Sequence, residues 1–150
     1  MRGKDRMGVI RYASSPDDED GGEEFLTFKV PEAALLRRPG GAPFAVGDSV
    51  LITIQVVDAA RFVFELQPAG LQFDPRAPAR LEVSYREADR DYDQDGDEDG
   101  EDDAFEREFG FWRQERPGLP WFRVSTVKIE DLEEVEADLT GFTRYAVAGN

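Results

Sequence analysis

The chain has 150 residues, about the size of one domain, and its 33 acids and 18 bases give a formal net charge of -15. The acidity is local: residues 87–108 hold 13 acids and two bases, residues 17–24 hold six acids and no base, and the remainder is near neutral at +2. Because phosphate binding needs clustered Lys and Arg, we expect no nucleic-acid ligand.

Neither cysteine nor histidine occurs in the chain. This excludes a disulfide, a Cys or His metal site, a cysteine nucleophile and a Ser-His-Asp triad built from its own residues. Carboxylate chemistry and metals that prefer oxygen ligands, such as calcium or magnesium, remain available.

The N-terminal sequence bears on localisation. The apolar stretch at residues 7–12 is far too short for a signal-peptide core, and no segment approaches the roughly 20 apolar residues of a membrane span. We therefore expect no membrane insertion. A chain that begins at its natural start is expected to be cytoplasmic, and one trimmed from a precursor is expected to be extracytoplasmic.

Residues 1–24 are expected to form a mobile, acidic N-terminal arm. Only Val9, Ile10 and Tyr12 offer side chains for burial there, and the acid run that follows has nothing to pack. We expect the folded domain to begin at Phe25 and to include residues 25–150.

The remaining sequence reads as short strands separated by Gly and Pro. Residues 80–86 alternate most plainly, with Leu81, Val83 and Tyr85 on one face, and residues 32–36 offer only a single helical turn. The pattern predicts an all-β fold, an antiparallel, immunoglobulin-like β-sandwich in which the acidic loop at 87–108 is a long hairpin insertion. The predicted strands lie at residues 25–30, 50–57, 61–66, 71–73, 80–86, 108–114, 121–127, 135–139 and 144–148.

Four sequence patterns occur in the order found in ZU-five domains, β-sandwich modules of zonula occludens proteins, netrin receptors and ankyrins. They are residues 30–35, residues 66–73 followed by Pro75, the strand that opens at Trp121, and residues 135–147. The chain resembles a ZU-five domain over about residues 25–148. Pro31 and Pro68 agree with this, since they lie where strands end and cannot donate to a central ladder.

The resemblance implies a non-catalytic protein-interaction or scaffold module whose partner is another protein chain or a second copy, as in a homo-oligomer. One branch of the family cleaves itself at a His-Phe-Ser triplet, which corresponds to Gly141, Phe142 and Thr143 here. Because glycine cannot move a proton, we expect no self-cleavage, with Phe142 in the core and Thr143 at the start of the last strand.

The acidic loop matches the spacing of an EF-hand calcium loop, which wraps one cation with alternate oxygen ligands and turns at a glycine, here Gly96. The loop differs from an EF-hand because no helix precedes it and position 12 is an aspartate. A solvated acidic loop without metal is the alternative interpretation. The candidate Ca²⁺ ligands are Asp91, Asp93, Asp95, Asp97, Asp99 and Asp102.

Aromatic residues flank the turn at residues 117–120. If residues 108–114 and 121–127 form a hairpin, Phe109 and Phe111 point to one face and Trp112 to the other. These rings either fill the core or stack on sugars, so a calcium-dependent adhesion or carbohydrate-binding β-sandwich is the alternative function. No acid pair stands out as a catalytic pair, and we expect the chain not to be an enzyme.

Overall fold

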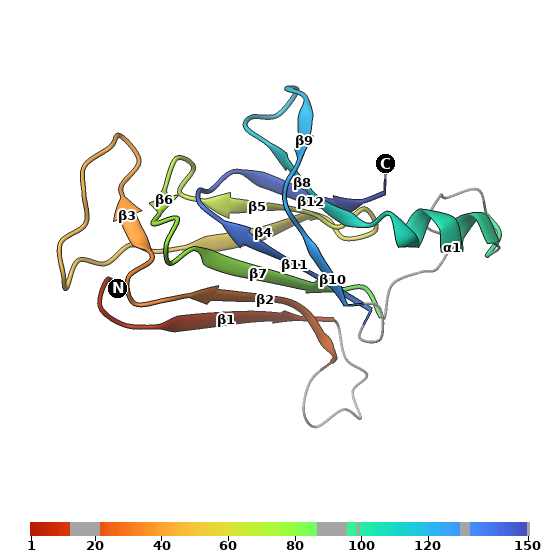
Figure 1. Ribbon diagram of the computed structural model, residues 1–150, viewed down its shortest axis with the longest axis horizontal. Coiled ribbons are helices and arrows are strands. Elements are labelled where there is room, and N and C mark those ends of the chain that lie inside the picture. The colour runs from red at the N-terminus through yellow and green to blue at the C-terminus, as the bar shows by residue number, and fades with distance from the viewer. Residues whose placement is uncertain (13–21, 87–95, 99, 130–132, 150) are drawn as a thin grey trace.

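A computed structural model describes residues 1–12, 22–86, 96–98, 100–129 and 133–149, and it shows an antiparallel β-sandwich with one short helix (Figure 1). The predicted all-β fold class is confirmed. The elements are β1 (Arg6–Arg11), β2 (Glu24–Val30), β3 (Leu35–Arg37), β4 (Thr53–Asp58), β5 (Val63–Gln67), β6 (Gln72–Phe73), β7 (Ala79–Ser84), α1 (Gly100–Arg107), β8 (Gly110–Gln114), β9 (Trp121–Arg123), β10 (Val127–Ile129), β11 (Glu134–Leu139) and β12 (Arg144–Ala148).

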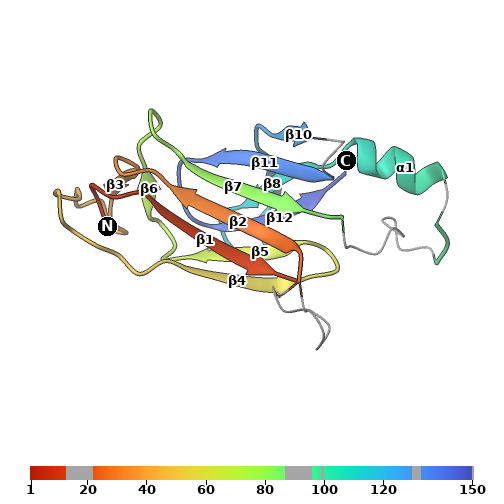
Figure 2. The ribbon, with the colours of Figure 1, turned by 90° about the horizontal axis from the view of Figure 1, so that it is seen from below.

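Two five-stranded antiparallel sheets form the sandwich (Figure 2). Sheet I has the order β1-β2-β7-β11-β10, and sheet II has the order β4-β5-β12-β8-β9. A two-stranded ribbon of β3 and β6 lies at one end. Because each sheet has one face in the core and one outside, polar and apolar side chains alternate along its strands.

The core lies between the inner faces of the two sheets. Leu81, Val83 and Tyr85 of the β7 segment are fully buried, as the alternation predicts. Phe64 of β5 packs edge to face on Phe111 of β8, with ring centroids 6.2 Å apart. Each fully buried side chain of this size stabilises the fold by roughly 1.5–3 kcal/mol, so the aromatic and aliphatic inner faces hold the sheets together.

The N-terminal segment differs from the expected mobile arm. Arg6–Arg11 forms β1, which pairs with β2 from Arg6 opposite Val30 to Ile10 opposite Leu26. The expectation failed because it weighed only side-chain burial, whereas an edge strand also gains backbone hydrogen bonds from its neighbour. The arm's acidic residues at positions 17–20 lie outside the described residues.

Three further segments differ from their predicted structures. The acidic loop at 87–108 is not a hairpin insertion, because it connects β7 of sheet I to β8 of sheet II and contains α1. The predicted helical turn at residues 32–36 gives way to β3, which pairs with β6. The predicted strand at residues 121–127 is split into β9 in sheet II and β10 in sheet I. The crossing is fixed by two hydrogen bonds, from Val124 N to Phe111 O at 2.9 Å and from Phe111 N to Thr126 Oγ1 at 2.9 Å.

The strands that precede the two acid-rich runs, residues 17–24 and 87–108, end at the same end of the sandwich. Arg11 at the end of β1 lies opposite Glu24, and Ser84 at the end of β7 lies opposite Glu134. Helix α1 projects from the same end (Figure 1). We call this the acidic end. Within the described ranges, no helix combines the length and apolar character of a membrane span.

Candidate functional site

Three glutamates converge on the outer face of sheet I: Glu82 on β7, and Glu134 and Glu136 on β11. Strand alternation sends these side chains outward, while the pairing register places Glu82 directly opposite Glu136. The carboxylate oxygens lie within 4.8 Å of one another, and each side chain is half-buried. We call these three residues the glutamate cluster.

The cluster's charges are partly compensated by two bases. Lys29 Nζ lies 2.6 Å from Glu82 Oε1, and Arg80 Nη1 lies 3.7 Å from Glu136 Oε2. Burial raises the pKa of Glu134 above its ordinary value, and the negative charges of Glu82 and Glu136 raise it further, while Lys29 lowers it. Three carboxylates of this spacing offer oxygen ligands for a hard cation, but the adjacent ammonium and guanidinium groups compete for the same oxygens.

The sequence-predicted calcium ligands fall mostly outside the described residues, which is the case for Asp91, Asp93, Asp95 and Asp99. Of the two that are described, Asp97 is exposed. Asp102 is buried, with 4% of its surface exposed, in the first turn of α1. The calcium loop therefore stays a prediction.

The glutamate cluster was missed by the sequence interpretation. The strand alternation of residues 80–86 and 135–139 identifies the outward positions on each strand. Nothing in the sequence states that these two strands pair, or in which register. The three carboxylates are brought together by the β7–β11 register alone.

A second surface lies on the outer face of sheet II, where β8 and β9 form the predicted hairpin. Trp112 and Trp121 are half-buried, whereas Phe109 and Phe111 are buried in the core, so the predicted opposite placement of Phe111 and Trp112 is confirmed. Pairing of Trp112 with Arg123, and of Gln114 with Trp121, puts both indoles and the guanidinium on the same side. We call Trp112, Trp121 and Arg123 the tryptophan face.

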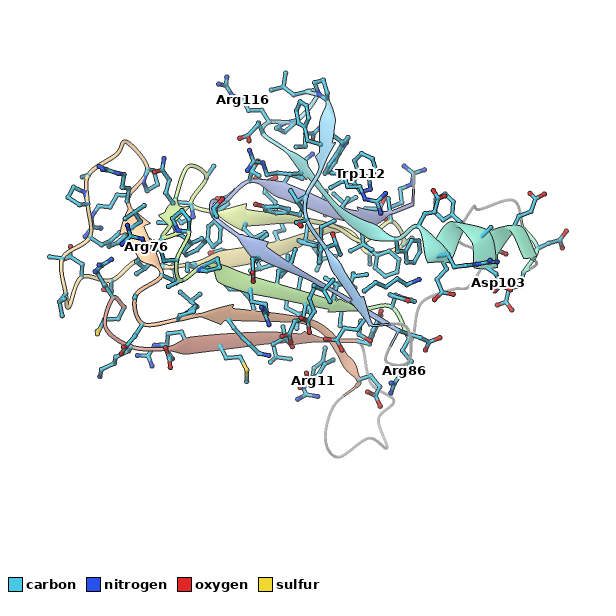
Figure 3. The ribbon with its side chains drawn as sticks, in the orientation of Figure 1. Arg11, Arg76, Arg86, Asp103, Trp112 and Arg116 are labelled. Atoms are coloured by element: carbon cyan, nitrogen blue, oxygen red, sulfur yellow. The ribbon has the colours of Figure 1, made fainter. Side chains whose placement is uncertain are left out.

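Local packing fixes two side chains of the tryptophan face, Trp112 and Arg123. The Trp112 indole Nε1 donates to Ala148 O at 3.2 Å, and the Arg123 guanidinium carbon lies 5.8 Å from the Trp112 ring centroid. Figure 3 shows Trp112 on the outer side of β8. Gly110 leaves room for Arg123, because a Cβ at Gly110 would lie only 3.0 Å from Arg123 Nη2. Arg123 Nη2 also donates to Glu108 O at 2.9 Å.

The segment that corresponds to the self-cleavage triplet is packed. Phe142 is buried and packs edge to face on Phe73 with ring centroids 5.0 Å apart, so its predicted core position is confirmed. Thr143 is also buried, and its hydroxyl donates to the Gln114 carbonyl. The hydroxyl is thus held toward β8 by a hydrogen bond.

A scan against protein-family models, a search of curated proteins and a search of solved structures each return no match to this chain. The ZU-five resemblance therefore stays a prediction drawn from the sequence.

Proposed function

We propose that the chain is a non-catalytic protein-interaction module that binds its partner through the tryptophan face. The observation that carries the proposal is that both tryptophans of the chain lie on the solvent side of sheet II rather than in the core. Tryptophan and arginine are the residues most enriched among those that dominate binding energy at protein interfaces.

The packing of the tryptophan face suits binding, because Trp112 and Arg123 are already held in place. The hydrogen bond from Trp112 to Ala148 and the contact of Arg123 with the indole restrict rotamers that a partner would otherwise have to immobilise. Next to this face, Glu65 and Arg144 form an ion pair in which the two opposite charges cancel. A partner can therefore approach this face without meeting a concentrated negative charge.

The same two indoles favour a carbohydrate-binding module as a second candidate function. Half-buried indole rings on the outer face of a sheet present apolar surfaces on which sugar rings stack. The two candidates differ in ligand class, and the same variants test both.

The test uses affinity capture from the source cell with the wild-type chain, a Trp121→Ala/Arg123→Glu variant and a Lys29→Ala control on sheet I. We expect one protein retained by the wild type and the control and lost with the double variant. Binding to a glycan array with the same dependence identifies the carbohydrate function instead. Equal capture by all three chains contradicts both, provided that circular dichroism shows equal folding.

A further inference from the structure

Strand β4 is an edge strand of sheet II. It pairs with β5 on one side, and within the described ranges no strand pairs with its other side. Figure 2 shows β4 at the border of the sandwich, on the same side as β1. An edge strand presents a row of backbone N–H and C=O groups that another strand can extend.

The composition of β4 lacks the usual protection against strand addition. Residues 50–57 contain neither a charge nor a proline. Leu51 and Val57 are 84% and 46% exposed. Natural edge strands are commonly blunted by Lys, Pro or inward-pointing charges, whereas β4 has only Asp58 at its end and the irregularity between Val56 and Asp58. This edge is therefore suited to pairing.

The other three edges of the two five-stranded sheets are less suited to pairing with a copy of themselves. Strands β9 and β10 have three residues each. Strand β1 carries two charged residues, Arg6 and Arg11, of the kind that blunts an edge against strand addition. A pairing of two β4 strands centred on Gln55 places Gln55 opposite Gln55 and Thr53 opposite Val57 of the second copy, and it brings no like charges together.

The charge distribution favours an antiparallel arrangement. The β4–β5 turn lies at the acidic end, because Phe62 in that turn stacks on Phe25 at the start of β2, with ring centroids 6.3 Å apart. Antiparallel pairing of two β4 strands directs the two acidic ends away from each other. For a chain of net charge -15, directing the two acidic ends apart lowers the repulsion between the two copies.

We propose that two copies of this chain associate through antiparallel pairing of β4 with β4, which joins two five-stranded sheets into one continuous sheet. The interface is isologous, with the two-fold axis between Gln55 and Gln55 of the second copy. Backbone hydrogen bonds across the axis and the contact of Val57 with Thr53 of the second copy stabilise it. It is independent of the tryptophan face, which lies at the opposite edge of sheet II.

The test is sedimentation equilibrium of the full chain and of charge variants at Gln55, whose exposed side chain lies next to its symmetry mate. We expect the wild type to dimerise, and Gln55→Lys and Gln55→Glu each to weaken dimerisation at least about tenfold by like-charge repulsion. An equimolar mixture of the two variants restores the dimer. Met7→Lys, on the β1 edge, is the matched control and leaves dimerisation unchanged.

Three outcomes overturn the proposal. The first is a wild type that stays monomeric up to millimolar concentration. The second is a Gln55→Lys chain that dimerises as strongly as the wild type. The third is a pair of variants that fold, by circular dichroism, yet stay monomeric when mixed. Loss of the dimer in Trp121→Ala/Arg123→Glu, with Gln55→Lys unaffected, assigns self-association to the tryptophan face instead.

Discussion

Arg144 on β12 and Glu65 on β5 form an ion pair across two neighbouring strands, with Arg144 Nη2 2.8 Å from Glu65 Oε2. The hydrogen bond from Arg144 holds the pKa of Glu65 below its ordinary value of 4.5, and one from Gln67 adds to the effect. Both side chains are half-buried. The pair thus neutralises two charges beside the tryptophan face and ties two central strands of sheet II together.

Glu65→Gln is expected to destabilise the fold at pH 7 by about 0.5 kcal/mol, as for a well-placed but solvent-accessible pair. Because the pKa of Glu65 is lower in the folded chain, its stabilisation is present above the unfolded pKa and is lost as the pH falls through the folded pKa. In urea unfolding at a series of pH values from 7 to below 4, the difference in free energy of unfolding between the variant and the wild type should shrink as the pH falls. A double-mutant cycle with Arg144→Met checks the assignment, since strictly additive losses contradict a coupled pair.

Glu134→Gln is expected to have the opposite sign and to stabilise the fold at pH 7 by roughly 0.5 kcal/mol. Burial and the charges of Glu82 and Glu136 raise the pKa of Glu134, so keeping it ionised in the folded chain costs stability. The pKa of Glu134 is 4.5 in the unfolded chain and higher in the folded chain. As the pH rises through this interval, the wild type loses stability relative to the variant. The advantage of the variant should therefore vanish below pH 4.5 in urea unfolding. A variant that is less stable than wild type at pH 7 contradicts the electrostatic assignment.

Strand alternation explains why much of the sandwich could be predicted from the sequence. Where one face is buried and the other is wet, as at residues 80–86, the period of two is visible in the side chains themselves. Strand β1 was not predicted, because its stabilisation comes largely from backbone pairing with β2. The division of residues 121–127 between two sheets was not predicted either, because the backbone stays extended on both sides of the crossing and the sequence pattern does not change there. Both errors concern strand pairings between segments that are far apart in the sequence.

The same distinction applies to the candidate sites. The opposite directions of Phe111 and Trp112 follow from adjacency in one strand, and the structure confirms them. The approach of Glu82 to Glu134 and Glu136 depends on a pairing between residues about 50 positions apart, which single-sequence periodicity does not encode.

Tyr145→Phe tests the hydrogen bond that anchors the turn before β12. The buried Tyr145 hydroxyl donates to Gly141 O at 2.7 Å, and its removal leaves that carbonyl without this donor. We expect a loss of about 1 kcal/mol in urea unfolding. Burial raises the pKa of Tyr145 above its ordinary value of 10, so the donor is retained throughout the physiological range. In a spectrophotometric titration the variant should lack one late-ionising tyrosine, and loss of an early-ionising tyrosine contradicts the burial argument.

Calcium titration distinguishes the predicted loop from the glutamate cluster as the place where a cation binds. A lone EF-hand-like loop without paired helices is expected to bind Ca²⁺ with an affinity of about 10⁻⁴ to 10⁻³ M. Calorimetry should give saturable heat for the wild type and for Glu134→Gln/Glu136→Gln, and none for the Asp91→Ala/Asp93→Ala/Asp95→Ala chain. Amide exchange should show protection appearing within residues 91–102 only when calcium is present.

The opposite dependence, with heat lost in the glutamate variant and kept in the aspartate variant, assigns the cation to the outer face of sheet I. There the metal must displace Lys29 from Glu82, so binding should also strengthen in Lys29→Ala. Absence of heat from the wild type at millimolar calcium contradicts the loop prediction. That result favours the alternative interpretation, a solvated acidic loop without metal.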